Sequence, residues 1–144
     1  MIIIEEIGTK DLEELSVLME ELSGNNTNYD KMVINYNWIK SNPDYFLLGA
    51  KYNNELVGTV MGIICKDIVS ECKPFMVIEN MVVKSTMRGK NIGKELIKEI
   101  ERIGREKDCY YTMLVSLKHR KEAHKFYVSV GYSLDTVQGF KKYL

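Results

Sequence analysis

The sequence predicts an α/β protein, with a mixed central β-sheet and helices on both faces of that sheet. Stretches rich in apolar and β-branched residues alternate along the chain with stretches whose apolar residues recur at helical spacing. The length of 144 residues, with 45% hydrophobic and 28% charged positions, is that of one compact domain covering residues 1–144. No repeat, low-complexity tract or linker interrupts the pattern.

The chain is expected to begin with one strand and two helices. Residues 2–7 have strand character, and Thr9 can cap a helix whose apolar residues recur at helical spacing. The turn-rich run 24–28 separates this helix from a second, shorter one. We expect the second helix to end before Asn42-Pro43, because proline disfavours helical backbone at the residue that precedes it.

The middle of the chain predicts three strands followed by a helix. Residues 45–66 are rich in β-formers and break at Asn53-Asn54, where asparagine tolerates the left-handed geometry that a tight hairpin requires. Residues 75–84 form a further apolar strand. From Ile92 to about Lys107 the apolar residues mark an amphipathic helix.

The C-terminal part predicts a strand, a helix and a closing hairpin. Residues 109–116 return to strand character, and a last helix follows whose apolar residues lie on one face. Gly131 can end that helix in a left-handed cap. A closing hairpin with its turn near residues 135–138 completes the expected α/β order.

Charge and cysteine content exclude several classes of protein. Lys and Arg number 20 and Asp and Glu number 20, so the positive field that attracts nucleic acid is missing. No apolar run approaches the roughly 18 residues of a membrane span, and two glutamates follow the short apolar start. Cys65, Cys72 and Cys109 lack the spacing of metal ligands. We therefore expect a cytoplasmic protein that binds no metal, nucleic acid or membrane.

The most informative segment is the loop between the strand at 75–84 and the helix from Ile92. It contains Arg88, Gly89 and Lys90, and Gly93 follows just inside the helix. Free N–H groups at a helix start point along the positive end of the helix dipole, and glycines let a phosphate approach them closely. Neither a P-loop nor a GxGxxG motif is present. The segment therefore predicts an anion site.

Two motifs resemble the GCN5-related N-acetyltransferase (GNAT) superfamily. Residues 88–93 are similar to its acetyl-CoA loop, Arg/Gln-x-x-Gly-x-Gly/Ala, with Asn91 where the first glycine usually stands. Residues 120–132 are similar to its Asn-x-x-Ala-x-x-(Phe/Leu)-Tyr-x-x-x-Gly-Phe helix, with Arg120 in place of the frequent Asn. Within the superfamily the resemblance over 78–144 is closest to aminoalkylphosphonate N-acetyltransferases, which combine RGxNxG with RxxAHxFYxxxGY.

The resemblance implies acetyl-CoA as cosubstrate and a sheet that splays between its fourth and fifth strands. The residues it implies in cofactor binding are Met81, Val82, Val83, Arg88, Gly89, Lys90, Asn91, Ile92, Gly93, Lys94 and Arg120. The acceptor amine attacks the thioester directly, and backbone N–H groups of the fourth strand stabilise the oxygen of the tetrahedral intermediate.

Two residues are candidates for proton transfer. An alkylammonium is mostly protonated at neutral pH, so a carboxylate or a water chain must accept its proton, and Glu79 is the candidate base. Tyr127 matches the position where the superfamily places the proton donor to the departing thiolate. His119 and His124 are five residues apart, which does not place them on one helix face as a metal pair needs.

The sequence leaves three functions open. A small-molecule amine acetyltransferase is preferred, because the polar, aromatic-flanked segment 24–45 could cover a compact substrate. A protein or peptide acetyltransferase would need an open groove instead. A non-catalytic acyl-CoA sensor would keep the loop without the chemistry. A homodimer is an expectation of the superfamily only.

Overall fold

The computed structural model describes residues 1–144, which form two compact units, 1–113 and 114–144. No helix is long and apolar enough to cross a membrane. The expectation of a single domain over 1–144 stays a prediction.

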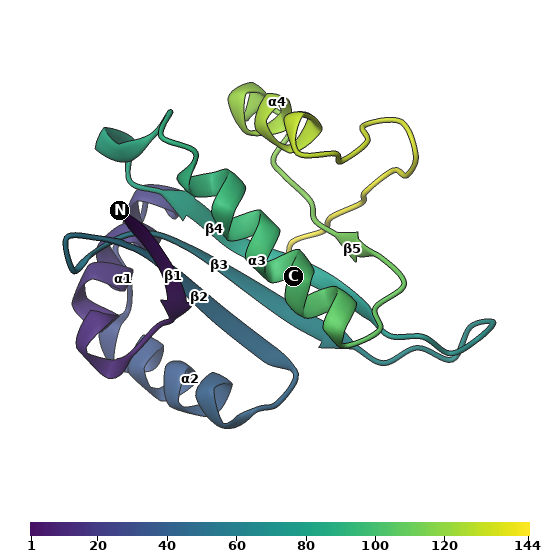
Figure 1. Cartoon of the computed structure of the whole chain (residues 1–144), viewed down its shortest axis with the longest axis horizontal. Coiled ribbons are helices and arrows are strands. Elements are labelled where there is room, and N and C mark those ends of the chain that lie inside the picture. The colour runs from purple at the N-terminus through teal and green to yellow at the C-terminus, as the bar shows by residue number, and fades with distance from the viewer. The chain divides into compact units, whose positions relative to one another are not determined.

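The first unit is built on a five-stranded mixed sheet in sequential order (Figure 1). The strands are β1 (Ile2–Glu6), β2 (Tyr45–Tyr52), β3 (Glu55–Cys65), β4 (Phe75–Val83) and β5 (Thr112–Met113). β1 to β4 are antiparallel to one another, whereas β5 is parallel to β4. This arrangement confirms the predicted α/β class and the mixed sheet.

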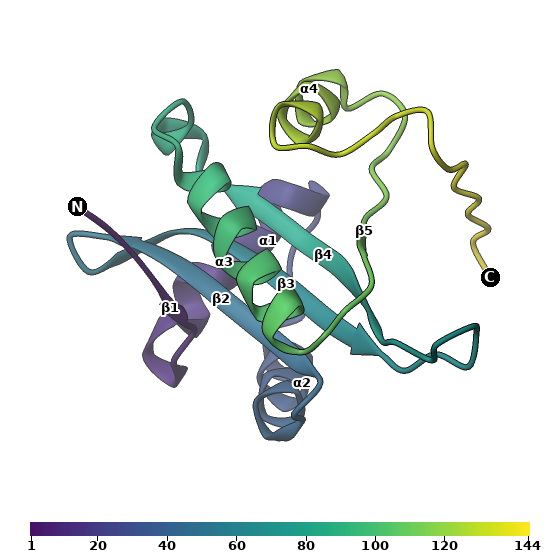
Figure 2. The same cartoon turned by 45° about the vertical axis from the view of Figure 1, so that its right-hand side comes forward.

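Helices cover both faces of this sheet, as predicted (Figures 1 and 2). α3 (Ile92–Glu106) lies on one face, and α1 (Leu12–Ser23) and α2 (Tyr29–Ser41) lie on the other. A short 3-10 turn, Thr9–Asp11, precedes α1. A second one, Ser85–Met87, lies between β4 and α3. The bounds of the three helices match the sequence prediction closely.

The α3 face is packed tightly because β3 carries glycines where the helix crosses it. A methyl group at Gly62 would lie 2.8 Å from the Ile100 side chain, and one at Gly58 would lie 3.2 Å from Leu96. Leu96 and Ile100 are fully buried. The glycines therefore let the helix approach the sheet closely.

The opposite face holds the core formed by α1 and α2. Leu12, Leu15 and Leu18 are 2–4% exposed, as their helical spacing predicts. Tyr36 of α2 is buried, and its hydroxyl donates to the Ile7 carbonyl at 2.9 Å. Both helices are thus anchored on the sheet.

A buried ionic cluster fixes the start of α1. The Lys51 ammonium lies 2.8 Å from Glu5 and 2.9 Å from Asp11, and the Lys51 side chain is 7% exposed. Asp11 also accepts a hydrogen bond from Gly8 N at 2.8 Å. The hydrogen bond to Glu5 is the main reason why the pKa of Lys51 lies above its usual value. The predicted cap at Thr9 is wrong: Asp11 is the N-cap of α1, because Thr9 opens the 3-10 turn.

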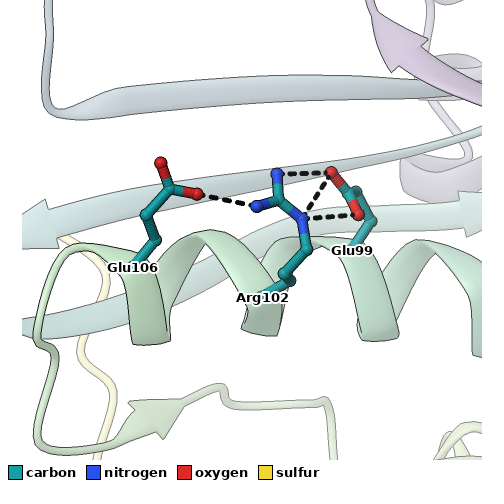
Figure 3. A network of polar contacts seen from close by, with 3 residues as sticks. All are labelled: Glu99, Arg102 and Glu106. Atoms are coloured by element: carbon teal, nitrogen blue, oxygen red, sulfur yellow. Dashed lines mark hydrogen bonds and ion pairs between the residues drawn. The ribbon is translucent and has the colours of Figure 1, made fainter.

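The solvent face of α3 carries a three-residue charge network (Figure 3). Arg102 donates to Glu99 at 2.9–3.1 Å and to Glu106 at 2.7 Å, one helical turn to each side. These hydrogen bonds lower the pKa of Glu99. Such pairs stabilise the long helix whose start forms the predicted anion site.

The second unit contains α4 (Lys121–Ser129) and an extended tail. The helix ends at Gly131, whose φ of 102° is left-handed, with Tyr132 N bonded to Tyr127 O at 3.0 Å and Gly131 N to Val128 O at 3.1 Å. This pattern is a Schellman motif and confirms the predicted glycine cap.

Two strand predictions in the C-terminal part are wrong. The strand expected at 109–116 is limited to Thr112–Met113, and residues 133–144 form no hairpin. Apolar residues of the tail such as Val137 and Phe140 are exposed. Strand character in the sequence becomes a strand only where a partner strand supplies ladder hydrogen bonds, and here only residues 112–113 pair with β4.

Candidate active site

The segment between β4 and α3 forms a loop of unpaired backbone donors. No N–H group from Gly89 to Lys94 donates a hydrogen bond within the protein, and the first intrahelical bond runs from Glu95 N to Asn91 O at 3.1 Å. Six consecutive donors therefore remain at the positive end of the α3 dipole. A phosphate group is the ligand that such an array suits best.

Two left-handed residues shape this loop. Gly89 has a φ of 76°, and Asn91, the N-cap of α3, has a φ of 63° and a ψ of 11°. Asparagine is one of the few residues that adopt this conformation at low cost. The turn therefore persists although the usual glycine is replaced, and the space around the Gly89 α-carbon is open to an incoming group.

Cations surround the loop. The Arg88 side chain is 60% exposed; its Nε donates to the Val83 carbonyl at 3.2 Å and its Nη2 lies 3.3 Å from Glu21 Oε1. Lys90 and Lys94 form no ion pair. Lys84 is paired with Glu55, which raises the pKa of Lys84.

The loop residues fit the pyrophosphate of acetyl-CoA. Open N–H groups, an uncrowded glycine and free cations are the donor set that a doubly charged diphosphate needs. Ile92 differs from the other residues of this set, since its side chain is 2% exposed and packs in the core. Only the Ile92 backbone N–H can face a ligand.

β4 leaves its outer edge open beside this loop. Its pairing with β5 is limited to Met76 with Thr112 and Val77 with Met113, so the ladder stops before the second half of β4. Val82 is buried, whereas Met81 and Val83 are half-buried. Lys84 N donates to the Val57 carbonyl of β3, so alternate N–H groups of this stretch point away from β3, and they form no ladder hydrogen bond to β5, as an oxyanion site requires.

A β-bulge interrupts β4 at the candidate base. Thr59 faces Val82 and Met61 faces Glu79, so Val60 lies opposite both Asn80 and Met81. Asn80 has a φ of 53°, and the side chains of Glu79 and Asn80 are both exposed. The bulge lies directly after Glu79, whose exposed side chain is on the part of β4 that β5 does not cover.

The remaining predicted residues belong to the second unit. Tyr127 is half-buried, with its ring 5.3 Å from that of Phe126 and 6.0 Å from that of Tyr132. Arg120 is the N-cap of α4, and its side chain makes no capping hydrogen bond. His124 Nε2 lies 3.0 Å from the Leu117 carbonyl oxygen. This contact gives the His124 side chain a local structural role.

Sequence reasoning missed the contacts that come from other parts of the chain. Glu21 on α1 accepts hydrogen bonds from Ser85 N and from Arg88, although α1 is remote in sequence. Its acidic character was visible, but no sequence pattern relates it to the loop. Glu14, Glu21, Glu55 and Lys84 line a cavity of ≈ 230 Å³ beside the loop.

Comparison with known proteins gives the same family that the motifs indicate. The family model described as "Acetyltransferase (GNAT) family" matches residues 10–132. A curated relative assigned as a glucosamine 6-phosphate N-acetyltransferase of Drosophila melanogaster is 28% identical over 120 residues. That match covers 82% of this chain and 53% of the relative, so the chain spans about half the relative's length.

Solved structures share the fold over nearly the whole chain. Glucosamine-6-phosphate N-acetyltransferase from Arabidopsis thaliana superposes with a TM-score of 0.87 at 21% identity, covering 99% of each chain. Aminoglycoside N-acetyltransferase AAC(6')-Iy in complex with CoA superposes with a TM-score of 0.84 at 19% identity, covering 99% of this chain and 95% of that chain. At these identities the likeness establishes the fold.

Proposed function

The chain belongs to the acetyltransferase (GNAT) family, and from this premise we propose that it transfers an acetyl group from acetyl-CoA to a primary amine of a small molecule. The observation that carries the proposal is the run of unpaired N–H groups from Gly89 to Lys94 at the α3 N-terminus. Acetyl-CoA supplies the activated thioester and leaves as the CoA thiol.

The loop residues bind the cosubstrate. Backbone N–H groups from Gly89 to Lys94 donate to the pyrophosphate, and the Arg88 guanidinium adds charge-assisted hydrogen bonds. Lys90 and Lys94 contribute positive charge to phosphate groups. The Ile92 side chain holds this array on the sheet by packing in the core.

The open edge of β4 stabilises the reacting carbonyl. Along Met81, Val82 and Val83, the backbone N–H groups that face the open edge donate hydrogen bonds to the thioester oxygen and stabilise the negative charge that develops on it. They are fixed by the pairing of β4 with β3 up to Gly58 and Val83. A rigid donor in this position costs no reorganisation during the reaction.

Two side chains move protons in this proposal. The exposed Glu79 carboxylate accepts a proton from the acceptor ammonium, directly or through a water chain, so that the neutral amine can attack. The Tyr127 hydroxyl donates a proton to the departing thiolate. Glu79→Gln should move the pH at which the reaction rate reaches half its maximum to a higher value. An unchanged pH dependence would favour the water chain alone.

The proposed substrate class rests on the relative named as a glucosamine 6-phosphate N-acetyltransferase. The name of that relative indicates a phosphorylated amino sugar. The motif resemblance instead favours an aminoalkylphosphonate. Both molecules carry a primary amine and a phosphorus oxyanion. We propose the phosphorylated amino sugar as the first substrate to test.

The test is CoA release from acetyl-CoA, followed with a thiol reagent across a panel of amines. The panel contains glucosamine 6-phosphate, aminoglycosides, aminoethyl- and aminomethylphosphonate, polyamines and basic peptides. Reactions without amine correct for the three free cysteines of the chain. Turnover with one compact amine supports the proposal, and turnover with peptides alone would replace it by a peptide acetyltransferase.

Tight CoA binding without turnover on any amine would instead indicate an acyl-CoA sensor. Tyr127→Phe separates the two functions, because an enzyme loses turnover while it keeps CoA affinity. Absence of CoA binding to the wild-type protein would reject all three functions.

A further inference from the structure

Glu21 links α1 to the cofactor loop. It lies in the last turn of α1, and its Oε1 accepts a hydrogen bond from Ser85 N at 2.8 Å, across 64 residues of sequence. The same oxygen lies 3.3 Å from Arg88 Nη2. The Glu21 side chain is 27% exposed, so this contact is partly shielded from solvent.

These contacts fix the two parts of the loop that come before the open N–H groups. The bond to Ser85 N holds the 3-10 turn Ser85–Met87, which is closed by Met87 N bonding to Lys84 O at 2.8 Å. The contact with Arg88 joins a second one, from Arg88 Nε to the Val83 carbonyl at 3.2 Å.

Arg88 keeps donors for a ligand while it is held in this way. A guanidinium has five N–H donors, and the two contacts use one on Nε and one on Nη2, so three are left, two of them on Nη1. A long, 60% exposed side chain loses rotamer freedom when it binds a phosphate, and prior fixation removes part of that cost.

We propose that Glu21 is a positioning residue for the cofactor loop, which acts through Arg88 and Ser85 and touches no substrate. This inference rests on the proposed function, because it assumes that the loop binds the CoA pyrophosphate. If Glu21 positions the loop, the affinity for CoA depends on a hydrogen-bond acceptor at residue 21. A carboxylate that merely competes with phosphate for Arg88 would have the opposite effect, since its removal would tighten CoA binding.

Three variants distinguish positioning from charge. Glu21→Ala removes the acceptor and the charge, and Glu21→Gln removes the charge while an amide oxygen can still accept from Ser85 N and Arg88. Glu13→Ala is the matched control, because Glu13 is an exposed glutamate of the same helix whose side chain forms no ion pair or hydrogen bond. The measurement is the Kd for CoA by titration calorimetry.

We expect Glu21→Ala to weaken CoA binding by about fivefold, the scale of one partly exposed charged contact. Glu21→Gln should stay within about twofold of the wild type, and Glu13→Ala should be unchanged. In an Arg88→Ala background the effect of Glu21→Ala should be smaller, because one of its two partners is gone.

The outcomes separate the inference from the proposed function. If the wild type binds CoA and Glu21→Ala binds equally or more tightly, the positioning role is wrong while the proposed function stands. If Glu21→Gln is as weak as Glu21→Ala, the charge and not the acceptor matters, and the inference also fails. If the wild type binds no CoA, the proposed function itself fails.

Discussion

Asn91 is the residue at which backbone conformation and cofactor binding are most directly coupled. Its φ of 63° is left-handed, and it is the N-cap from which the open N–H groups of α3 follow. A left-handed conformation costs about 1–2 kcal/mol for an ordinary residue and little for glycine. Whether replacement of Asn91 changes the free energy of unfolding and the affinity for CoA therefore depends on the new side chain.

Asn91→Val should lower the free energy of unfolding by about 1–2 kcal/mol if the turn is kept, since a β-branched residue is strained there. If the turn relaxes instead, the N–H groups no longer converge and the affinity for CoA should fall about tenfold. Asn91→Gly should keep both quantities near wild type. Urea unfolding and titration calorimetry measure the two quantities on the same samples.

Asn53→Val is the matched control for this experiment. Asn53 also has a left-handed φ of 51°, but it lies in the β2–β3 hairpin. The variant should lose similar stability and keep its CoA affinity. An Asn91→Val protein with wild-type stability and wild-type affinity would refute the argument that this conformation shapes the site.

Four further predictions follow from other parts of the structure. Arg88→Ala should weaken CoA binding by about tenfold in calorimetry, because it removes a charge-assisted contact to phosphate; unchanged affinity would contradict its assignment. Tyr127→Phe should lower kcat about a hundredfold and leave the Kd for CoA unchanged, as expected for a lost proton donor. Lys51→Met leaves a buried carboxylate without its cation and should cost about 3–5 kcal/mol in urea unfolding, whereas a loss below 1 kcal/mol would show that the cluster is not needed. Arg102→Ala should lower the midpoint of urea unfolding only slightly, since the Arg102 side chain is 57% exposed. The pKa of Glu99 is lowered on folding, so this contribution is complete above about pH 4.5 and disappears as the pH falls through the lowered pKa.

Local features of the fold could be predicted from the sequence. Asn53 and Asn54 are both left-handed in the β2–β3 turn, and Gly131 caps α4, as their residue types predict. α3 begins at Ile92 because its apolar spacing starts there. These features depend on neighbouring residues, which a sequence shows directly.

Features that depend on distant partners could not be predicted. The contact of Glu21 with Arg88 joins residues 67 positions apart, and the ion pairs of Lys51 join three separate elements. The bulge at Asn80 is visible only once the register with β3 is known. The tail 133–144 has apolar residues and forms no strand, because strand formation needs a partner that sequence alternation does not supply.

The central claim is that the N–H groups at the start of α3 hold the pyrophosphate of acetyl-CoA. Titration of acetyl-CoA into ¹⁵N-labelled protein tests it most directly, because it reports on each backbone amide. The largest shifts should fall on Gly89 to Lys94, with slower hydrogen exchange at the same amides on saturation. Binding that leaves these amides unchanged, or shifts confined to other parts of the chain, would show that the pyrophosphate is held elsewhere.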